Sequence, residues 1–461
     1  MEAFADKMKT HNPSLEEFHG SIAVPPHGAG VLRRYRAFAG PALLIGAGYM
    51  DPGNWATDLQ AGARFGYGLL WVVALASLMA LFLQALAVRL GVATGKDLAQ
   101  ACRDWYPGWT RWPNWALAEI AIGACDLAEV LGSAVALNLL FHIPMFWAVL
   151  ITACDVLLLL ALQHFGLRLI EAVILVLVAT VGFCYFLELV VLPATRPDFV
   201  RIGGAILHPT LSQTGMITLA IGIVGATVMP HNLYLHSALV QSRRIEPTDS
   251  ARRSAIRYNA IDCAVALTLA FLINAAILIL AALVYHGSDG LTVAGVRYIF
   301  GADTDWIRVA YLTLAPLLGA AAAGIVFAIA LLASGQSSTI TGTLAGQVVM
   351  EGFMRWRVKP WQRRLVTRLA AIVPAIALIG INGDGNVTNL LVLSQVVLAL
   401  QLPFAMFPLL HFTSRAKFMG RWKNGPLLLA VGWSSAILIA AMDLYGLPGA
   451  LAEAWRVAAG G

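Results

Sequence analysis

The sequence predicts an all-α polytopic membrane protein with eleven transmembrane helices, and three observations lead to this fold class. First, 59% of the 461 residues are hydrophobic and only 12% are charged, whereas soluble globular domains carry about 25% charged residues. Second, the apolar residues form runs of the roughly 20 residues that a helix needs to cross a bilayer. Third, Lys and Arg concentrate in alternate loops. These observations exclude a soluble fold.

Eleven runs have the length and composition of a spanning helix. In chain order they cover residues 40–63, 68–92, 115–140, 144–163, 168–192, 215–240, 259–285, 315–347, 366–382, 388–412 and 426–445. The tryptophan-rich stretch 96–113 carries charges and predicts an interfacial loop or a short amphipathic helix. Residues 1–30 are polar and contain three prolines, so we expect a disordered tail that leads into the first span.

The loop charges predict the orientation of the chain. Lys and Arg gather in the tail and in the loops after the second, fourth, sixth, eighth and tenth runs, whereas the opposite loops hold few basic residues and several aspartates. Basic loops face the cytoplasm, so the tail (1–36) and the N-terminus should lie inside and the C-terminus outside. The net charge of +6 resides in these loops and forms no basic stripe interleaved with aromatics, which argues against nucleic-acid binding.

The cysteines predict neither a disulfide framework nor a zinc site. Five are scattered along the chain without a C-x-x-C pair: Cys102, Cys125, Cys154, Cys184 and Cys263. Four of them lie in apolar runs, and we expect buried thiols.

The first and sixth spans contain helix breakers near mid-membrane. The first carries "DPGN" at 51–54, and the sixth carries "GATVMPHNLYLHS" at 225–237. Proline lacks an N–H and clashes with the carbonyl four residues back, so each break leaves carbonyls that need a cation or water. In transporters built from inverted repeats, paired breaks in corresponding positions indicate the substrate site. We therefore expect repeats of spans 1–5 (37–192) and 6–10 (215–412), with the last span (426–445) appended.

The residues at the breaks favour a transition metal. Asp51 and Asn54 are spaced i and i+3, so their side chains can converge on one point once the helix resumes after the break. A carboxylate in mid-membrane costs about 2.5–3.5 kcal/mol, so we expect Asp51 to have a function. Across from them the sixth span offers Met229 and the Ala226 carbonyl, which Pro230 cannot satisfy. Hard ions prefer all-oxygen sites, whereas a thioether suits a softer divalent ion.

Two later spans carry further polar residues. The stretch 334–346 is rich in Ser, Thr and Gly, which predicts close helix approach. Of the two glutamines in the tenth span, Gln395 lies nearer its middle than Gln401, and we expect Gln395 to supply an oxygen near the metal.

A second group of ionisable residues lies within the membrane spans. Its members are Asp126 and Glu129 in the third span and His231, His236 and Arg243 in the sixth. Such residues usually pair or mark a proton relay. For Asp126 and Glu129 both a relay and a static salt-bridge network stay open, whereas His231, two residues from Met229, favours a functional role. Glu171 has no evident partner in the sequence.

At these residues the sequence resembles the Nramp family of proton-coupled divalent metal transporters. The matching stretches are "DPGN" at 51–54, "DLAEVLGSA" at 126–134, "MPHNLYLHS" at 229–237, "GQSSTITGTLAGQVVMEG" at 335–352 and "LSQV" at 393–396. The likeness covers roughly residues 37–445, and the pairing of DPGN with MPH at this separation is highly specific.

The resemblance implies a LeuT-type fold and alternating access in a bacterial-type plasma membrane, with protons driving import of Mn²⁺ or Fe²⁺, and also Cd²⁺ and Co²⁺. It implies these metal ligands: Asp51, Asn54, Met229, the carbonyls of Ala226 and Gly48, and a state-dependent Gln395. The implied proton pathway contains Asp51, His231, Asp126, Glu129, Arg243 and Arg368. The family often has alanine at position 48, a change that a carbonyl ligand tolerates. No cofactor is implied besides the transported ions.

Three alternatives compete with this reading. An organic-solute symporter of the same fold would need a break that attracts a substrate carboxylate, which Asp51 would repel. An intramembrane metal-dependent enzyme would be expected to show H-E-x-x-H or G-x-S-x-G, and neither occurs. A metal-gated channel would not need a relay of carboxylates within the membrane. The sequence leaves open the choice between Mn²⁺ and Fe²⁺, the proton stoichiometry and the oligomeric state.

Overall fold

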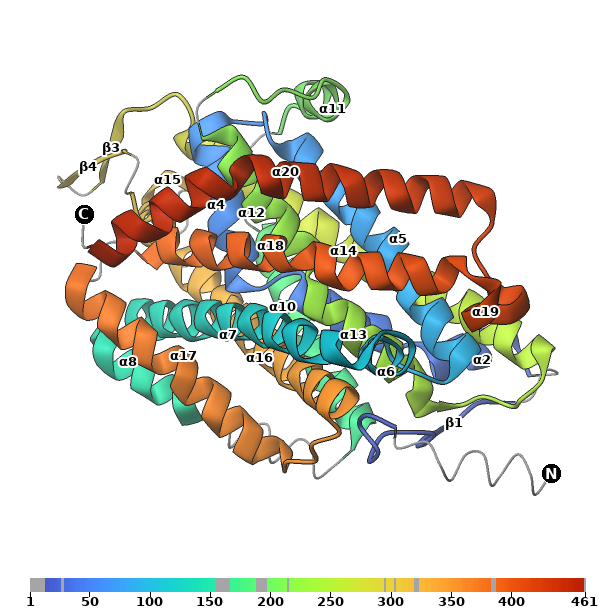
Figure 1. Cartoon of the computed structure of the whole chain (residues 1–461). Helices are drawn as coiled ribbons and strands as arrows, with labels where there is room; N and C mark the ends of the chain where they lie inside the picture. Colours follow the sequence, from blue (N-terminus) through green and yellow to red (C-terminus); the bar gives the residue numbers. More distant parts are fainter. Residues whose placement is uncertain are drawn as a thin grey trace.

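Helices make up most of the computed structural model (Figure 1), which describes residues 13–25, 29–154, 166–187, 197–213, 215–293, 296–301, 304–318, 323–382 and 387–459. The α-helices are α2 (Val31–Phe38), α3 (Pro41–Gly48), α4 (Pro52–Phe65), α5 (Leu70–Thr94), α6 (Leu98–Trp105), α7 (Arg111–Phe141), α8 (Met145–Ile151), α10 (Leu167–Phe186), α11 (Phe199–Leu207), α12 (Met216–Val228), α13 (Pro230–Leu239), α14 (Asp249–Tyr285), α15 (Trp306–Leu318), α16 (Ala323–Met354), α17 (Pro360–Asn382), α18 (Val387–Ser414), α19 (Ala416–Met419) and α20 (Pro426–Ala459).

Short 3-10 turns and two small sheets complete the described elements. The turns are η1 (Gly108–Thr110), η2 (Thr152–Cys154), η4 (Val240–Ser242) and η6 (Gly420–Trp422). Strand β1 (Ile22–Ala23) pairs in parallel with β2 (Arg243–Arg244), and β3 (Gly290–Val293) pairs antiparallel with β4 (Val296–Ile299). The first pair joins segments more than 200 residues apart.

Each of the eleven predicted runs overlaps a described helix, and eight helices within the described ranges are long and apolar enough to cross a membrane. The other three runs are the first, which is broken into α3 and α4, the fourth, which continues past the described end of η2, and the ninth, which is α17. The eighth run, predicted at 315–347, covers the end of α15 and most of α16, and residues 319–322 between them lie outside the described residues. The short helix expected within 96–113 is α6.

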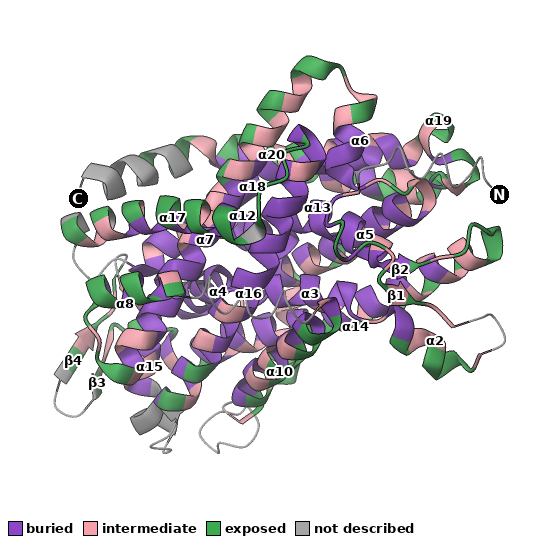
Figure 2. Cartoon of the chain, turned by 90° about the horizontal axis from the view of Figure 1, so that it is seen from below, coloured by how far each residue is buried: buried purple, intermediate pink, exposed green. Residues whose placement is uncertain are grey.

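The broken helices lie at the centre of the bundle. In Figure 2, α4, α12, α13 and α16 are mostly buried, whereas α17 and α10 carry many exposed residues. Of the spanning window in Met216–Ser242, which covers the sixth span, 89% is buried, against 22% for Pro426–Gly449 in α20. The sixth span is therefore enclosed by other helices, and the eleventh lies at the periphery with apolar side chains exposed.

The prediction of a disordered tail is wrong for residues 13–25, which fold back onto the protein. Leu15 and Phe18 are 3% and 5% exposed and belong to the main hydrophobic core. The Leu15 N–H donates to Glu351 Oε2 of α16 (2.9 Å), and the Gly20 N–H donates to the Gln241 carbonyl of η4 (3.0 Å). Two buried apolar side chains and these hydrogen bonds offset the cost of ordering the segment.

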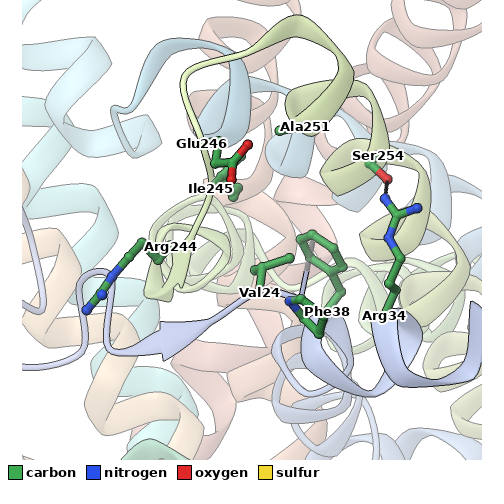
Figure 3. Close-up of a pocket in the computed structure, with 9 residues that line it drawn as sticks. Val24, Arg34, Phe38, Arg244, Ile245, Glu246, Ala251 and Ser254 are labelled. Carbon is green, nitrogen blue, oxygen red and sulfur yellow. Dashed lines mark hydrogen bonds between the residues drawn. The ribbon is translucent and has the colours of Figure 1, made fainter. Parts of the chain in front are cut away.

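A small pocket lies between this segment and α2 (Figure 3). Its lining includes Val24, Arg34 and Phe38, together with Arg244 of β2 and Ser254 of α14. Its volume of about 30 Å³ has room for little more than water. It shares no residue with the two helix breaks.

The described cysteines are free thiols, as predicted. Cys102, Cys125, Cys184 and Cys263 are buried. The expectation of burial is wrong for Cys154, which is exposed at the end of η2.

Candidate functional site

The first break places Asp51 at the start of α4. Asp51 is extended (φ −67°, ψ 165°), and its side chain caps the helix by accepting from the Asn54 N–H (2.8 Å). Pro52 occupies the first helical position, where its missing N–H costs nothing. A Cβ on Gly132 would lie 2.2 Å from Pro52 Cβ, so glycine at this position lets α7 pack directly against the break.

The second break places Met229 between α12 and α13. Met229 has φ 40° and ψ 96°, a left-handed conformation that costs a non-glycine residue about 1–3 kcal/mol. Its side chain is fully buried and packs against Cys125 and Leu398. Pro230 begins α13. Such strain persists only where the surroundings hold it, and it concentrates at functional sites.

Asn54 joins the two breaks. Its Nδ2 donates to Asp51 Oδ1 (2.8 Å) and to the carbonyl of Ala226 (2.9 Å), the carbonyl that Pro230 cannot satisfy. Asp51 Oδ2 is buried without a hydrogen-bond partner among the described residues. The amide nitrogen thus occupies the position between two oxygens that a cation would favour. Rotation of the Asn54 amide would present its oxygen there instead.

The other carbonyls of the first break are satisfied by protein groups. The Tyr49 carbonyl accepts from Asn274 Nδ2 of α14 (2.8 Å), and the Met50 carbonyl accepts from Trp55 Nε1 (3.2 Å) and from Ser334 of α16. The Gly48 carbonyl accepts from the Asp51 N–H (3.2 Å). The expectation that freed carbonyls need a cation or water was too broad, because neighbouring helices supply donors.

Gln395 and Gly48 also lie beside the breaks. A Cβ on Gly53 would lie 1.8 Å from Gln395 Nε2, so the glutamine amide packs directly against the first break. Gln395 Oε1 is buried and has no hydrogen-bond partner within the described ranges. A Cβ on Gly48 would lie 3.5 Å from Met229 Sδ. The structure therefore gathers all six residues that the sequence named as metal ligands around the two breaks.

The ionisable residues of α7 form a buried cluster with α17. Arg364 contacts Asp126 Oδ1 (2.5 Å) and Glu129 Oε2 (3.3 Å), and Arg368 lies 3.9 Å from Glu129. All four side chains are at most 1% exposed. Sequence reasoning missed Arg364, although Arg364 and Arg368 are one helical turn apart and both lie close to the predicted start of the ninth span.

Cys125 links this cluster to the second break. Its Sγ lies 3.9 Å from His231 Nε2 and donates to Glu129 Oε1 (3.6 Å), which also accepts from Ser338 (3.0 Å). His231 Nδ1 is buried without a hydrogen-bond partner in the described part of the chain. A line of titratable groups therefore runs from α13 to α7 and α17.

Arg243 does not join this cluster in the described contacts. It pairs with Glu171 of α10 (2.9 Å) and donates to the carbonyls of Ala37 (3.2 Å) and Ala39 (2.6 Å). Glu171, for which the sequence suggested no partner, also pairs with Arg168 (2.7 Å). Arg243 thus ties the end of the sixth span to α10, to the end of α2 and to the residue that follows α2.

His236 belongs to a different polar chain. Its Nδ1 lies 3.0 Å from Gln84 Oε1 of α5, and Gln84 Nε2 donates to the Tyr49 hydroxyl (2.8 Å). The chain connects α13 with the end of α3, so it couples the two broken spans.

The sequence matches the family described as "Natural resistance-associated macrophage protein-like" over residues 42–448. The chain belongs to the Nramp family. It is 51% identical over 440 residues to the divalent metal cation transporter MntH of Nostoc sp., a match that covers 94% of this chain and 96% of that protein. The MntH of Listeria innocua is 48% identical over 435 residues, with 94% of each protein covered.

Solved structures agree with the Nramp assignment. A manganese transporter of Eremococcus coleocola, crystallised with an aromatic bis-isothiourea substituted compound, matches with a TM-score of 0.86 at 37% identity, covering 96% of this chain and 92% of that one. A nucleobase-cation-symport-1 family transporter shares the fold alone, with a TM-score of 0.55 at 13% identity. The predicted family and the LeuT-type helical membrane fold are confirmed, and the protein is an integral membrane protein.

Proposed function

We propose that this Nramp protein is a secondary active importer that couples protons to the uptake of divalent transition metal ions. Mn²⁺ is the expected cargo, with Fe²⁺, Cd²⁺ and Co²⁺ as further substrates. The observation that carries the proposal is the convergence of a carboxylate, an amide, a backbone carbonyl and a thioether at two broken helices in the buried centre of the bundle. The similarity to divalent metal cation transporters and to a manganese transporter supports it.

The ion would bind where Asn54 Nδ2 now bridges Asp51 and Ala226. Asp51 supplies negative charge, the Asn54 amide turns its oxygen inward, and Met229 adds sulfur, which disfavours Ca²⁺ and Mg²⁺. The carbonyl oxygens of Ala226 and Gly48 complete the set. Gln395 joins in the conformation in which α18 brings its Oε1, which has no hydrogen-bond partner among the described residues, to the ion.

Protons would follow the line of groups that leads from Asp51 and His231 through Cys125 to Glu129. Asp126, Arg364 and Arg368 surround the end of that line. Arg243, which the resemblance also assigns to the proton pathway, would act at the other end of the sixth span, where it pairs with Glu171 of α10.

The architecture behind this activity would be two inverted repeats, spans 1–5 and 6–10, followed by an appended α20. The N-terminus would face the cytoplasm of a bacterial cell and the C-terminus the outside, because the basic loops lie on the N-terminal side. Alternating access would then rock these repeats around the breaks.

Two observations argue against the alternatives. The relatives of this chain are named divalent metal cation transporters, which does not favour a metal-dependent enzyme. Asp51 faces the second break, so it would repel the carboxylate of an organic substrate.

The test is uptake of Mn²⁺, Fe²⁺, Cd²⁺, Co²⁺, Ca²⁺ and Mg²⁺ into proteoliposomes with the internal pH recorded. We expect transition-metal uptake accompanied by internal acidification, and Asp51→Asn should abolish both because it removes the only carboxylate among the proposed ligands. Asp443→Asn is the matched control, since it removes a buried carboxylate from α20 at the periphery. Full activity of Asp51→Asn would overturn the site.

A further inference from the structure

The side chain of Asn232 makes an unusual contact beside Met229. Asn232 lies in the first turn of α13 and is fully buried. Its Nδ2 donates to Met229 Sδ at 3.3 Å, and its Oδ1 has no hydrogen-bond partner among the described residues. A thioether is a weak acceptor, and an unsatisfied buried oxygen is unfavourable. Folding alone therefore gives little reason for an asparagine at this position.

Gly48 provides the space that this amide occupies. A Cβ built on Gly48 would lie 2.7 Å from Asn232 Nδ2, closer than side-chain carbons approach other atoms. It would also lie 3.5 Å from Met229 Sδ and from Thr341 Oγ1. An alanine at position 48 would push the Asn232 amide away from the sulfur.

We propose that Asn232 is a positioning residue for the metal site, which holds the Met229 thioether in place, and that Gly48 makes room for it. The inference rests on the proposed function, in which Met229 is a metal ligand. Methionine has three rotatable side-chain bonds and adapts easily. The N–H···S contact uses one lone pair of the sulfur and fixes its direction, so the other lone pair is presented to the ion without a further loss of side-chain freedom.

Loss of this contact should affect soft ions more than hard ones. Asn232→Leu keeps the approximate volume and removes the donor, so Met229 must be ordered each time an ion binds. Ordering one flexible side chain corresponds to about a 2- to 10-fold loss of affinity. Cd²⁺ depends most on the sulfur, so its Kd should rise by that factor, whereas the Kd of Mn²⁺, held mainly by oxygens, should change less.

Gly48→Ala offers a second route to the same state. It should lower the preference for Cd²⁺ over Mn²⁺ in the same direction as Asn232→Leu. Because both changes act through one contact, the double variant should lose no more than the larger single effect. Gly123→Ala is the control, since a Cβ on Gly123 of α7 would have no atom within 4 Å.

The experiment measures Kd for Cd²⁺ and Mn²⁺ by titration calorimetry of the purified full chain, with melting temperature as a check on folding. Met229→Ala is measured in parallel and should lower the Cd²⁺ preference. If it does and Asn232→Leu and Gly48→Ala do not, the positioning role is wrong and the proposed ligand stands. If Met229→Ala leaves the preference unchanged, the ligand role fails as well. Equal losses for both ions in Asn232→Leu would show a purely structural role and also overturn the inference.

Discussion

Two of the buried oxygens that lack hydrogen-bond partners in the described part of the chain lie at the first break. They are Asp51 Oδ2 at the first break and Gln395 Oε1 of α18, which packs against Gly53 of the same break. An unsatisfied buried polar atom costs about 1–3 kcal/mol. A cation between them would recover that cost at both residues. At the scale of single residues, the proposed metal site therefore contains hydrogen-bond acceptors that no described donor satisfies.

The Met229 sulfur is the single atom proposed to select transition metals over Ca²⁺ and Mg²⁺. We expect Met229→Ala to retain Mn²⁺ uptake, because the oxygen ligands remain, and to let Ca²⁺ or Mg²⁺ compete, because the all-oxygen site that results suits hard ions. Competition by Ca²⁺ against Mn²⁺ or Cd²⁺ uptake in proteoliposomes measures this effect. Inhibition by Ca²⁺ no stronger than in the unmodified protein would contradict the role of the sulfur.

Sequence reasoning identified the residues that are unusual for the apolar run in which they occur. Asp51 is charged in an apolar run, and Met229 precedes a proline in another, so each is visible without knowledge of its neighbours. Arg364 lies outside the ninth predicted run, which begins at 366, whereas α17 begins at Pro360. For Cys125 the sequence indicates no more than a buried thiol. Their roles arise from contacts between helices that no single stretch of sequence shows.

At the scale of helices, glycines on α16 decide how the ionisable cluster packs. A Cβ on Gly342 would lie 2.9 Å from Glu129 Oε1, and one on Gly346 would lie 1.8 Å from Arg363 of α17. The small residues predicted to allow close approach therefore bring α7 and α17 against α16. The hydroxyl of Ser338 on the same helix donates to Glu129. Close packing and a polar function coincide on one helix face.

The relay and static roles of this cluster make different predictions for Glu129→Gln. We expect this neutral variant to alter the pH dependence of uptake and the accompanying proton flux more than metal affinity, because it removes a proton acceptor that is linked through Cys125 to His231. Uptake from pH 5 to 8 and metal titration of the same variant test this. An unchanged pH profile with a lowered melting temperature would favour the static network, since breaking a buried pair costs about 3–5 kcal/mol.

The cap of α6 predicts a pH-dependent stability. Asp97 lies in the loop before α6 and accepts from the Gln100 N–H (2.8 Å), and burial raises its pKa to about 6. A carboxyl whose pKa is raised by folding binds its proton more tightly in the folded state. Its ionisation therefore destabilises the fold as pH rises from about 4 to above 6, by about 3 kcal/mol at most.

Asp97→Asn keeps an oxygen that can cap α6 but cannot ionise. We expect it to raise the melting temperature in detergent at pH 7.5 relative to the unmodified protein, with the difference disappearing near pH 4. Asp104→Asn is a suitable comparison, because Asp104 sits nearby at the end of the same helix and burial is outweighed there by Arg103 and Lys96, which lower its pKa. A melting-temperature difference for Asp97→Asn that is constant with pH would contradict the effect of burial.

At the scale of the whole molecule, the N-terminal segment connects helix ends that belong to different parts of the chain. Ser14 accepts from Gln100 of α6 (3.4 Å), Leu15 donates to Glu351 of α16, and β1 pairs with β2 after α13. Composition alone predicted disorder for this segment because it is polar and contains prolines. The partners that order it lie up to 336 residues away. Residues 13–25 carry only two large buried apolar side chains, too few to form a periodic pattern.

The N-terminal segment should also influence which conformation the protein adopts. It contacts the end of α13 and the end of α16 at once, so it stabilises states in which those ends are close together. Phe18→Ala should cost about 3–5 kcal/mol of that contact, enough to shift a two-state ratio more than about 100-fold if the segment detaches in the other state. Ser242 is 2% exposed. We expect the cysteine of Ser242→Cys to react faster with a thiol reagent when Phe18→Ala is also present than when it is absent. Phe199→Ala, which removes a phenylalanine that is 79% exposed on α11, should leave the reaction rate unchanged. Equal rates in both backgrounds would mean that the segment packs onto the protein without influencing which conformation it adopts.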